Sequence, residues 1–314
     1  MTSREAFAER WAVRLGAERW RSGAPLAPLT TFRVGGPAEW LAEIRSEDEL
    51  EALASDASES GIPVSILGGG SNVLVADAGV AGVVIRLHLT TIEQPASDRV
   101  RAGAGVTING LVRWTINHGL AALEAWAGTP GTVGGAVFGN AHFSGRNIGE
   151  LITSVQLVSR AGDVRTVAAD AMAFGYDRSR LQQTGEVLLT ADFPVGRGEP
   201  AVLRAVARES LAFRKQTQPL DTPSAGCIFQ NPQPGIDAVP DGIPWSAGAL
   251  VDRAGMKGVA VGGARVSPVH GNFIVNEGAA TATEIRQLIE QCQRTVRDRF
   301  GVSLREEIVY LGDW

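Results

Sequence analysis

The segment SAGCIFQNP, residues 224–232, places Cys227 between small residues and a polar Gln-Asn-Pro. A thiol can donate a proton to a reacting carbon, since its ordinary pKa is about 8.5. A free cysteine is also one of the residue types most often buried as apolar filler. On the residues alone both interpretations of Cys227 stay open.

Glycines gather in four clusters, at 35–36, 68–70, 128–135 and 255–263. Such clusters mark backbone that bends through positive φ or approaches another group closely. They are typical either of tight turns or of a large flat ligand held by main chain. The cluster GGGSN, at 68–72, follows an expected strand, so its N–H groups can meet a pyrophosphate. It lacks the third glycine and the following helix of the dinucleotide fingerprint, which disfavours a Rossmann site.

A second segment, AGTPGTVGGAVFGNAH at 127–142, consists almost entirely of small residues. Small side chains permit close approach to a planar ligand such as a flavin ring. A close crossover of two chain segments would need the same composition, so the two explanations remain open. Neither the loop at 68–72 nor the segment at 127–141 contains a histidine or a cysteine for covalent attachment of a flavin, and we expect any flavin to be held non-covalently.

The composition limits the classes of function. The chain has 314 residues, 44% of them hydrophobic and 20% charged, with a net charge of −5. This acidic balance and the dispersed Lys and Arg argue against a nucleic-acid partner. Two cysteines form no disulfide or zinc pattern, so no metal site is predicted and a reducing compartment is expected. With neither a signal peptide nor a long apolar stretch, the protein is expected to be cytoplasmic and not to enter a membrane.

Several elements must position these residues. We expect helices at 46–61, 106–118, 199–216 and 281–300, with capping boxes at Ser46/Glu49 and Thr281/Glu284. We expect a buried strand at 63–67, strands at 73–75, 83–85 and 186–193, and a hairpin of 155–158 with 164–167. In the last helix Cys292 shares one face with Ile285, Leu288, Ile289, Val296 and Phe300, so it is expected to be core filler.

Six segments in order resemble the UDP-N-acetylenolpyruvoylglucosamine reductase (MurB) family, in its shorter subtype. They are LTTFRVGGPAEW (29–40), ILGGGSNVLVAD (66–77), AGTPGTVGGAVFGNA (127–141), SAGCIFQNP (224–232), SAGALVDRAGMKGVAVGGARVSPVHGNFIVN (246–276) and LREEIVYLG (304–312). The resemblance covers the chain from about residue 25 to its end. One glycine loop would be a weak signal, whereas six ordered segments are specific.

The resemblance implies an α+β fold: an FAD-binding fold of the vanillyl-alcohol-oxidase (PCMH) type in two subdomains, followed by a C-terminal α/β substrate-binding domain. We expect the FAD-binding region at 1–215, with subdomains at about 20–90 and 91–215, and the UDP-sugar domain at 216–314. It also implies a reaction. NADPH reduces FAD, hydride passes to the enolpyruvyl methylene carbon of UDP-N-acetylglucosamine enolpyruvate, and an acid protonates the adjacent carbon to give UDP-N-acetylmuramate. A monomer is expected.

The family's functional residues carry over to matching positions. The FAD loops fall on Gly68, Gly69, Gly70, Ser71 and Asn72, and on Thr129, Gly134, Gly135 and Ala136. The proton donor, usually serine, falls on Cys227, the C-terminal carboxylate on Glu307, and substrate contacts on Lys215, Asn231 and His270. Since neighbours in a strand face opposite ways, Glu306 would then face solvent. The resemblance thus favours the proton-donor role of Cys227 over that of a filler.

At one position the sequence departs from the family. Relatives show Tyr-Arg-x-Ser, where the arginine helps to stabilise an enolate, but this chain has Tyr176-Asp177-Arg178-Ser179. A carboxylate is a poor substitute for a guanidinium in that role. We expect Arg178 to enter the site through an irregular backbone, with Arg180 as the alternative.

Two other functions compete with the reductase. Another flavin oxidoreductase or oxidase of the same fold would leave the C-terminal segments unexplained. A non-catalytic nucleotide-sugar or flavin-binding protein would show flavin absorbance without consuming NADPH in response to the enolpyruvyl sugar.

Overall fold

The computed structural model describes residues 2–143 and 145–314, which form two compact units. The first unit comprises residues 1–24, 39–69 and 81–212, and the second comprises 25–38, 70–80 and 213–314. The second unit therefore combines the C-terminal part of the chain with two short early segments. The boundary predicted at residue 215, between the FAD-binding region and the UDP-sugar domain, remains a prediction.

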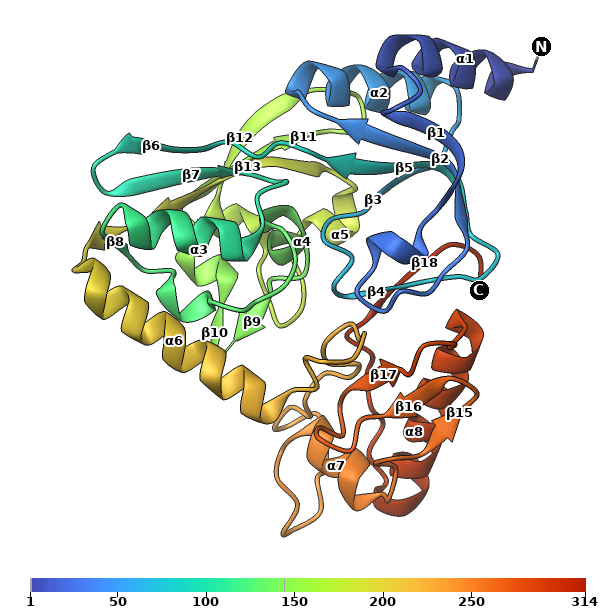
Figure 1. Ribbon diagram of the computed structural model, residues 1–314, viewed down its shortest axis with the longest axis vertical. Helices are drawn as coiled ribbons and strands as arrows, with labels where there is room; N and C mark the ends of the chain where they lie inside the picture. The colour runs from blue at the N-terminus through green and yellow to red at the C-terminus, as the bar shows by residue number, and fades with distance from the viewer. Residues whose placement is uncertain (1, 144) are drawn as a thin grey trace. The chain divides into compact units, whose positions relative to one another are not determined.

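The first unit contains a four-stranded sheet in the order β1-β2-β5-β3. Its strands are β1 (Trp20–Pro25), β2 (Pro37–Ile44), β5 (Val80–Leu87) and β3 (Val64–Ile66), with β3 parallel to β5. Helices α1 (Ser3–Leu15) and α2 (Glu47–Glu59) lie side by side near β1 and β2 (Figure 1). Aromatic side chains fill the space between them, and the rings of Trp20 and Trp40 stack at 6.0 Å between centroids.

A five-stranded antiparallel sheet, in the order β12-β11-β13-β7-β6, forms the rest of the first unit. Its strands are β12 (Val164–Ala168), β11 (Ser154–Val158), β13 (Val187–Pro194), β7 (Arg99–Gly103) and β6 (Ile92–Ala96). Helices α3 (Ile108–Asn117) and α4 (Val133–Phe138) bury their apolar faces in the same core as this sheet, around Trp126. The helix α6 (Pro200–Thr217) adds Leu203 and Ala207 to that core.

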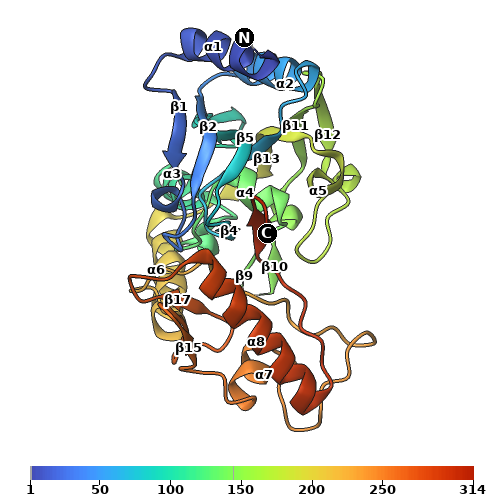
Figure 2. The same cartoon turned by 90° about the vertical axis from the view of Figure 1, so that its right-hand side faces the viewer.

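The second unit holds a small antiparallel sheet, β15 (Ala260–Val261), β16 (Ala264–Val266) and β17 (Ile274–Asn276). Helix α8 (Ala282–Phe300) packs against β15 and β16, next to α7 (Ala247–Arg253) (Figure 2). A separate parallel pair joins β4 (Val73–Val75) to β18 (Val309–Leu311). This pairing places the strand that follows the glycine loop 68–72 beside the C-terminal segment.

Shorter elements complete the chain. They are η1 (Ala27–Leu29), β8 (Leu120–Ala121), η2 (Glu124–Trp126), β9 (His142–Phe143), β10 (Arg146–Asn147), η3 (Ile148–Leu151), η4 (Ala169–Met172), α5 (Leu181–Thr184) and β14 (Gly196–Arg197). Across the described residues, no helix has both the length and the apolar character needed to cross a membrane.

Most expected elements are confirmed, including the hairpin of β11 with β12 and the strand rather than helix after GGGSN. Cys292 is 1% exposed on the buried face of α8, so it is core filler as predicted. Two details are wrong. Strand β3 is not buried, since Val64 and Ile66 are 39% and 38% exposed at the edge of its sheet. Ser46 accepts from the Glu49 N–H, but the Glu49 carboxylate accepts from Arg45 instead of closing a capping box.

Helix α8 has two N-terminal caps. Thr281 and Glu284 form the predicted capping box. The carboxylate of Asp77 also accepts the N–H groups of Ala282 and Thr283, each at 2.9 Å. Burial raises the pKa of Asp77, but the hydrogen bonds from Thr283 and Ala282 outweigh it and hold the pKa below its ordinary value. An early segment of the chain therefore stabilises the start of the last helix.

We predict that Asp77→Ala lowers the free energy of unfolding by about 1 kcal/mol at neutral pH, because two N–H groups lose their acceptor. Since the folded pKa of Asp77 is depressed, this contribution is present above the ordinary carboxyl pKa and is lost as the pH falls through the folded value. Denaturant titrations at several pH values measure it. The exposed Asp241 provides the control, and an Asp241→Ala variant equally destabilised would contradict the capping role.

Candidate functional site

In the second unit, the segment that carries Cys227 is held by hydrogen bonds to two other segments. Ile228 donates its N–H to the Asn272 carbonyl at 2.9 Å, and its own carbonyl accepts from Glu307 N–H at 2.8 Å. The Asn272 side chain accepts from Phe229 N–H and donates to Phe229 O, at 2.9 and 2.7 Å. An isolated bridge joins Phe229 to Glu306 in the same segment.

These contacts bring Glu307 next to the cysteine segment and to the glycine loop. Asn72 donates its side-chain N–H to the Glu307 carbonyl at 3.1 Å, and its own carbonyl accepts from Val309 N–H at 3.1 Å. Two predicted site residues, Asn72 and Glu307, thus contact each other directly. Cys227, one residue before Ile228, joins the same group within the second unit.

The two neighbouring glutamates differ in their surroundings. Glu306 accepts from Gln293 Nε2 at 3.0 Å. Burial raises the pKa of Tyr310 well above its ordinary value, and a hydrogen bond to Glu306 adds to the rise.

 The expectation that Glu306 faces solvent is therefore wrong, because its carboxylate is engaged with α8 and Tyr310. Glu307 stays the predicted catalytic carboxylate.

A buried cation lies close to Cys227, and sequence reasoning missed it. Arg214 is 6% exposed in the last turn of α6. Burial lowers the pKa of its guanidinium to about 10, and the charge of Cys227 acts in the opposite direction. The guanidinium therefore remains charged at neutral pH, and it favours the thiolate form of Cys227. The signal was present in the sequence, since Arg214 falls on the apolar stripe of α6 that contains Leu203, Ala207 and Ser210.

The predicted substrate contacts have different surroundings. His270 accepts the Asn272 N–H at its Nδ1 atom, at 3.1 Å, so Nε2 carries the proton of the neutral ring. Burial lowers the pKa of His270, and the positive charge of Lys257 acts in the same direction. Asn231 accepts from the Ala247 N–H at 3.0 Å at the start of α7. Lys215 is exposed in the last turn of α6.

The first glycine loop combines close backbone packing with N–H groups that have no acceptor. A Cβ on Gly69 would lie 2.6 Å from the Gly131 Cα, and one on Gly68 would lie 2.8 Å from the Thr132 Oγ1. Within the described part of the chain, no acceptor pairs with the N–H groups of Gly69, Gly70 and Ser71. Gly70 is nevertheless buried. Consecutive N–H groups of this kind fit an anion such as the pyrophosphate of FAD.

The second small-residue segment turns into α4 beside that loop. Thr132 caps α4 by accepting from Gly135 N–H at 3.3 Å. Gly134 donates its N–H to Ala104 O at 2.9 Å, and its Cβ position would lie 3.1 Å from the same oxygen. Gly135 is exposed, whereas Thr129 and Ala136 are buried. The segment thus packs closely against other backbone, as a crossover would require. It also exposes small residues, as close approach of a planar ligand would require.

The segment that departs from the family forms a tight turn in the first unit. Gly175 and Arg178 exchange two backbone hydrogen bonds, and Asp177 has φ +53°. Arg178 is exposed and folds back over Gly175, while Arg180 pairs with Glu186 at 3.0 Å. The predicted irregular backbone is present. Arg180 has a structural partner, and the role predicted for Arg178 stays a prediction.

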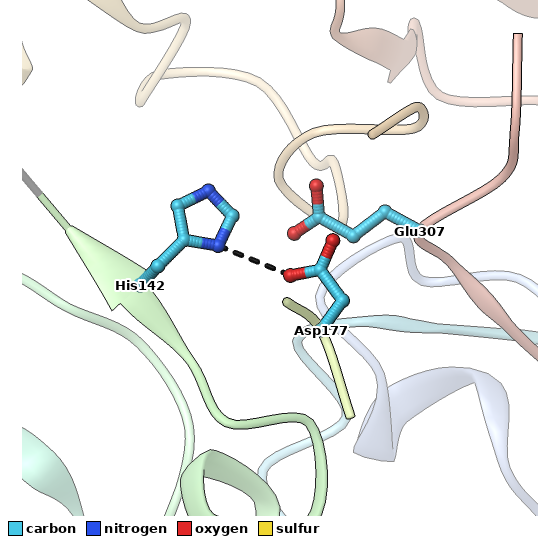
Figure 3. A group of neighbouring side chains, drawn as sticks. All are labelled: His142, Asp177 and Glu307. Atoms are coloured by element: carbon cyan, nitrogen blue, oxygen red, sulfur yellow. Dashed lines mark hydrogen bonds and ion pairs between the residues drawn. The ribbon is translucent and has the colours of Figure 1, made fainter. Parts of the chain in front are cut away.

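Asp177 contacts a residue that the sequence did not single out. Its Oδ1 lies 3.1 Å from the Nδ1 of His142, a contact drawn as the dashed line in Figure 3. The His142 ring also packs on Tyr176, with centroids 5.2 Å apart. The only sequence signal was a histidine at the end of a run of small residues.

Comparisons with known proteins place the chain in a family. Residues 218–311 match the C-terminal domain of UDP-N-acetylenolpyruvoylglucosamine reductase, and residues 38–168 match the FAD binding domain. UDP-N-acetylenolpyruvoylglucosamine reductase from Heliobacterium modesticaldum is 37% identical over 94% of this chain and 91% of that protein. The chain belongs to the UDP-N-acetylenolpyruvoylglucosamine reductase family.

Further comparisons agree with that assignment. The reductase of this name from Synechococcus sp. (strain WH7803) is 40% identical over 92% of both chains. The crystal structure of UDP-N-acetylenolpyruvylglucosamine reductase (MurB) from Thermus caldophilus has a TM-score of 0.77 and 32% identity, covering 93% of this chain and 98% of that one. The predicted α+β class, with an FAD-binding fold followed by the C-terminal domain of the UDP-N-acetylenolpyruvoylglucosamine reductase family, is confirmed. The chain is an FAD-dependent oxidoreductase of this family.

We predict that Arg214→Gln raises the apparent pKa of Cys227 alkylation by roughly half a unit or more, because the thiolate loses a nearby positive charge. The pH dependence of the iodoacetamide reaction measures it. Cys292 does not interfere, since burial raises its pKa to about 12. Arg214→Lys retains the charge and is the control. An unchanged pH profile in Arg214→Gln would show that the two groups do not interact.

Proposed function

We propose that this chain reduces UDP-N-acetylglucosamine enolpyruvate to UDP-N-acetylmuramate, with NADPH as the electron donor, in the synthesis of peptidoglycan precursors. One observation carries the proposal: in a chain of this family, hydrogen bonds tie the Cys227 segment to the Glu307 backbone and Glu307 to Asn72. An acid, a carboxylate and a residue of the expected flavin loop are thus held together within one unit.

FAD, when bound, supplies the transfer of hydride from NADPH and then to the methylene carbon of the substrate. The residues proposed to hold it are those of the two loops: Gly68, Gly69, Gly70, Ser71 and Asn72, and Thr129, Gly134, Gly135 and Ala136. The N–H groups of the first loop that lack an acceptor fit its pyrophosphate. The small side chains of the second loop permit close approach to its ring.

Cys227 is the proposed proton donor. Addition of hydride to the methylene carbon leaves an electron pair on the adjacent carbon and its carboxylate. Cys227 gives its thiol proton to that carbon and becomes a thiolate. Arg214 stabilises the thiolate, because its buried guanidinium stays charged at neutral pH.

The other residues bind and orient the substrate. Glu307 is the proposed second catalytic group, and Arg178 is the arginine that the sequence predicts for the enolate. Lys215, Asn231 and His270 are proposed to contact the UDP-sugar. A neutral His270 with its proton on Nε2 would donate a hydrogen bond there without adding charge. We further propose that the protein is a cytoplasmic monomer.

The most direct test is spectroscopic. The purified protein should show flavin absorbance, and acid precipitation should release the flavin. NADPH oxidation should then depend on UDP-N-acetylglucosamine enolpyruvate. NADPH oxidation that does not require the sugar, with oxygen as the acceptor, would instead indicate an oxidase.

We predict that Cys227→Ser keeps substantial activity, because a hydroxyl can donate the same proton. Cys227→Ala should slow the reoxidation of reduced flavin by substrate by about 10²–10⁴-fold. Stopped-flow measurements separate this step from flavin reduction by NADPH, which should survive in both variants. Normal turnover of the alanine variant would leave Cys227 as filler.

We predict that Glu307→Gln impairs the reoxidation step far more than Glu306→Gln does. Glu306 already accepts a hydrogen bond from Gln293, and an amide oxygen can keep that bond. The two variants are matched in size and in loss of charge, so stopped-flow rates compare them directly. Equal effects would remove the basis for assigning the catalytic role to Glu307.

A further inference from the structure

The presence of Asp177 where the family motif has arginine poses a chemical problem. If the proposed reduction takes place, negative charge develops on the substrate carboxylate as hydride arrives, and it must be stabilised by a cation or hydrogen-bond donors. At the matching position this chain offers a carboxylate, which would repel that charge. Arg180 pairs with Glu186, and Arg178 is exposed on the turn.

The Asp177 carboxylate orients a second group. A carboxylate only accepts hydrogen bonds, so the Nδ1 of His142 donates to Asp177 Oδ1 at 3.1 Å. This contact fixes the ring in one orientation. When the ring holds a proton on both nitrogens, Nε2 can donate a second hydrogen bond to an anion. Asp177 and His142 together can then present a cationic donor at the position where the family motif has arginine.

Hydrogen bonds between two segments of the first unit hold this pair in place. Asn140 donates its side-chain N–H to Gly175 O at 2.7 Å, and Ser179 Oγ donates to Phe138 O at 2.8 Å. Gln182 Nε2 donates to the carbonyl of Asp177 at 3.0 Å. The segment with His142 and the turn with Asp177 are thus bound to each other at several points.

Backbone strain is concentrated in the same two segments. Among the residues that the structure describes, five other than glycine have positive φ, and three of them lie here: Asn140 at +45°, Ala173 at +49° and Asp177 at +53°. Left-handed backbone outside glycine costs free energy and tends to gather at functional sites. Asp177, whose carboxylate contacts His142, is one of these three residues.

We propose that His142 is a catalytic residue of the reductase, and that its Nε2–H donates to the substrate carboxylate as negative charge develops there. Asp177 is a positioning residue that orients the His142 ring through the contact of its Oδ1 with Nδ1. No bond to His142 forms or breaks: the electron pair moves onto the substrate, and the proton still comes from Cys227. This inference rests on the proposed function, since it assigns the anionic group that the pair meets.

Half-reaction kinetics on the FAD-loaded enzyme test the proposal. His142→Ala should slow the reoxidation of reduced flavin by substrate by about 10²–10³-fold, the usual loss for one such donor. Flavin reduction by NADPH should stay within about twofold. His118→Ala is the control. The Nδ1 of His118 likewise contacts an oxygen atom, the main-chain carbonyl of Trp114 at 2.8 Å, but His118 lies outside the proposed site.

A rescue variant distinguishes catalysis from folding. In His142→Ala with Asp177→Arg, a guanidinium occupies the position that it has in relatives, and reoxidation should recover by about tenfold or more over His142→Ala alone. A loss in His142→Ala without this recovery would reduce the residue to a structural role. If Arg178→Ala slows reoxidation while His142→Ala does not, the arginine holds the role and the proposal is wrong.

Nitrogen NMR provides a readout independent of turnover. The chain has four histidines, so ¹⁵N-histidine spectra of the holoenzyme can be assigned with the two alanine variants. UDP-N-acetylmuramate should shift the His142 Nε2 signal, whereas UDP-N-acetylglucosamine, which lacks the carboxylate, should not. Asp177→Asn should shift the Nδ1 signal without any ligand. Equal shifts with both sugars would contradict contact with the carboxylate. Wild-type enzyme that fails to reduce the enolpyruvyl sugar would instead refute the proposed function itself.

Discussion

The candidate site depends above all on the buried side chain of Asn272. This amide makes two hydrogen bonds to the backbone of Phe229, one as acceptor and one as donor. Phe229 is 2% exposed and lies outside the regular strands of the described residues, so its backbone groups need these partners. The Asn272 carbonyl also accepts the Ile228 N–H, and the Ile228 carbonyl accepts the Glu307 N–H. An uncharged residue thus helps to hold the segment that carries the predicted acid.

Glycine imposes the second constraint. The first loop can approach the backbone of Gly131 only because Gly69 lacks a Cβ, and Gly70 packs in the same way on the backbone of Leu29. These contacts give the glycines a packing role besides any approach to a ligand. In the ranges 2–143 and 145–314 that the structure describes, the N–H groups of Gly69, Gly70 and Ser71 in this loop have no acceptor. The missing side chains thus permit both the close packing that is observed and the anion binding that we propose.

The sequence predicts local features well because their causes are local. The capping box of Thr281, the apolar face of α8 and the hairpin of β11 with β12 each follow from residues a few positions apart. The bonds of Asn272 to Phe229 and of Asp77 to α8 join residues far apart in the chain, and no periodicity announces them. The exposure of β3 was not predicted for a similar reason. Its place at the edge of the sheet depends on distant strands, and its apolar composition does not reveal it. The burial of Arg214 was predictable in principle, because the residue falls on the apolar face of a helix.

The replacement of an arginine by Asp177 is intelligible only together with His142. A carboxylate with 8% of its side chain exposed is costly unless a hydrogen-bond donor or a cation accompanies it. Across residues 2–143 and 145–314, Oδ2 of Asp177 is buried without a hydrogen bond, so the contact of Oδ1 with His142 has to offset much of that cost. A guanidinium carries its charge and its donors in one side chain. The imidazole needs the carboxylate to fix the orientation of its ring. In the site that we propose, Asp177 and His142 therefore act together in the role that a single guanidinium would fill.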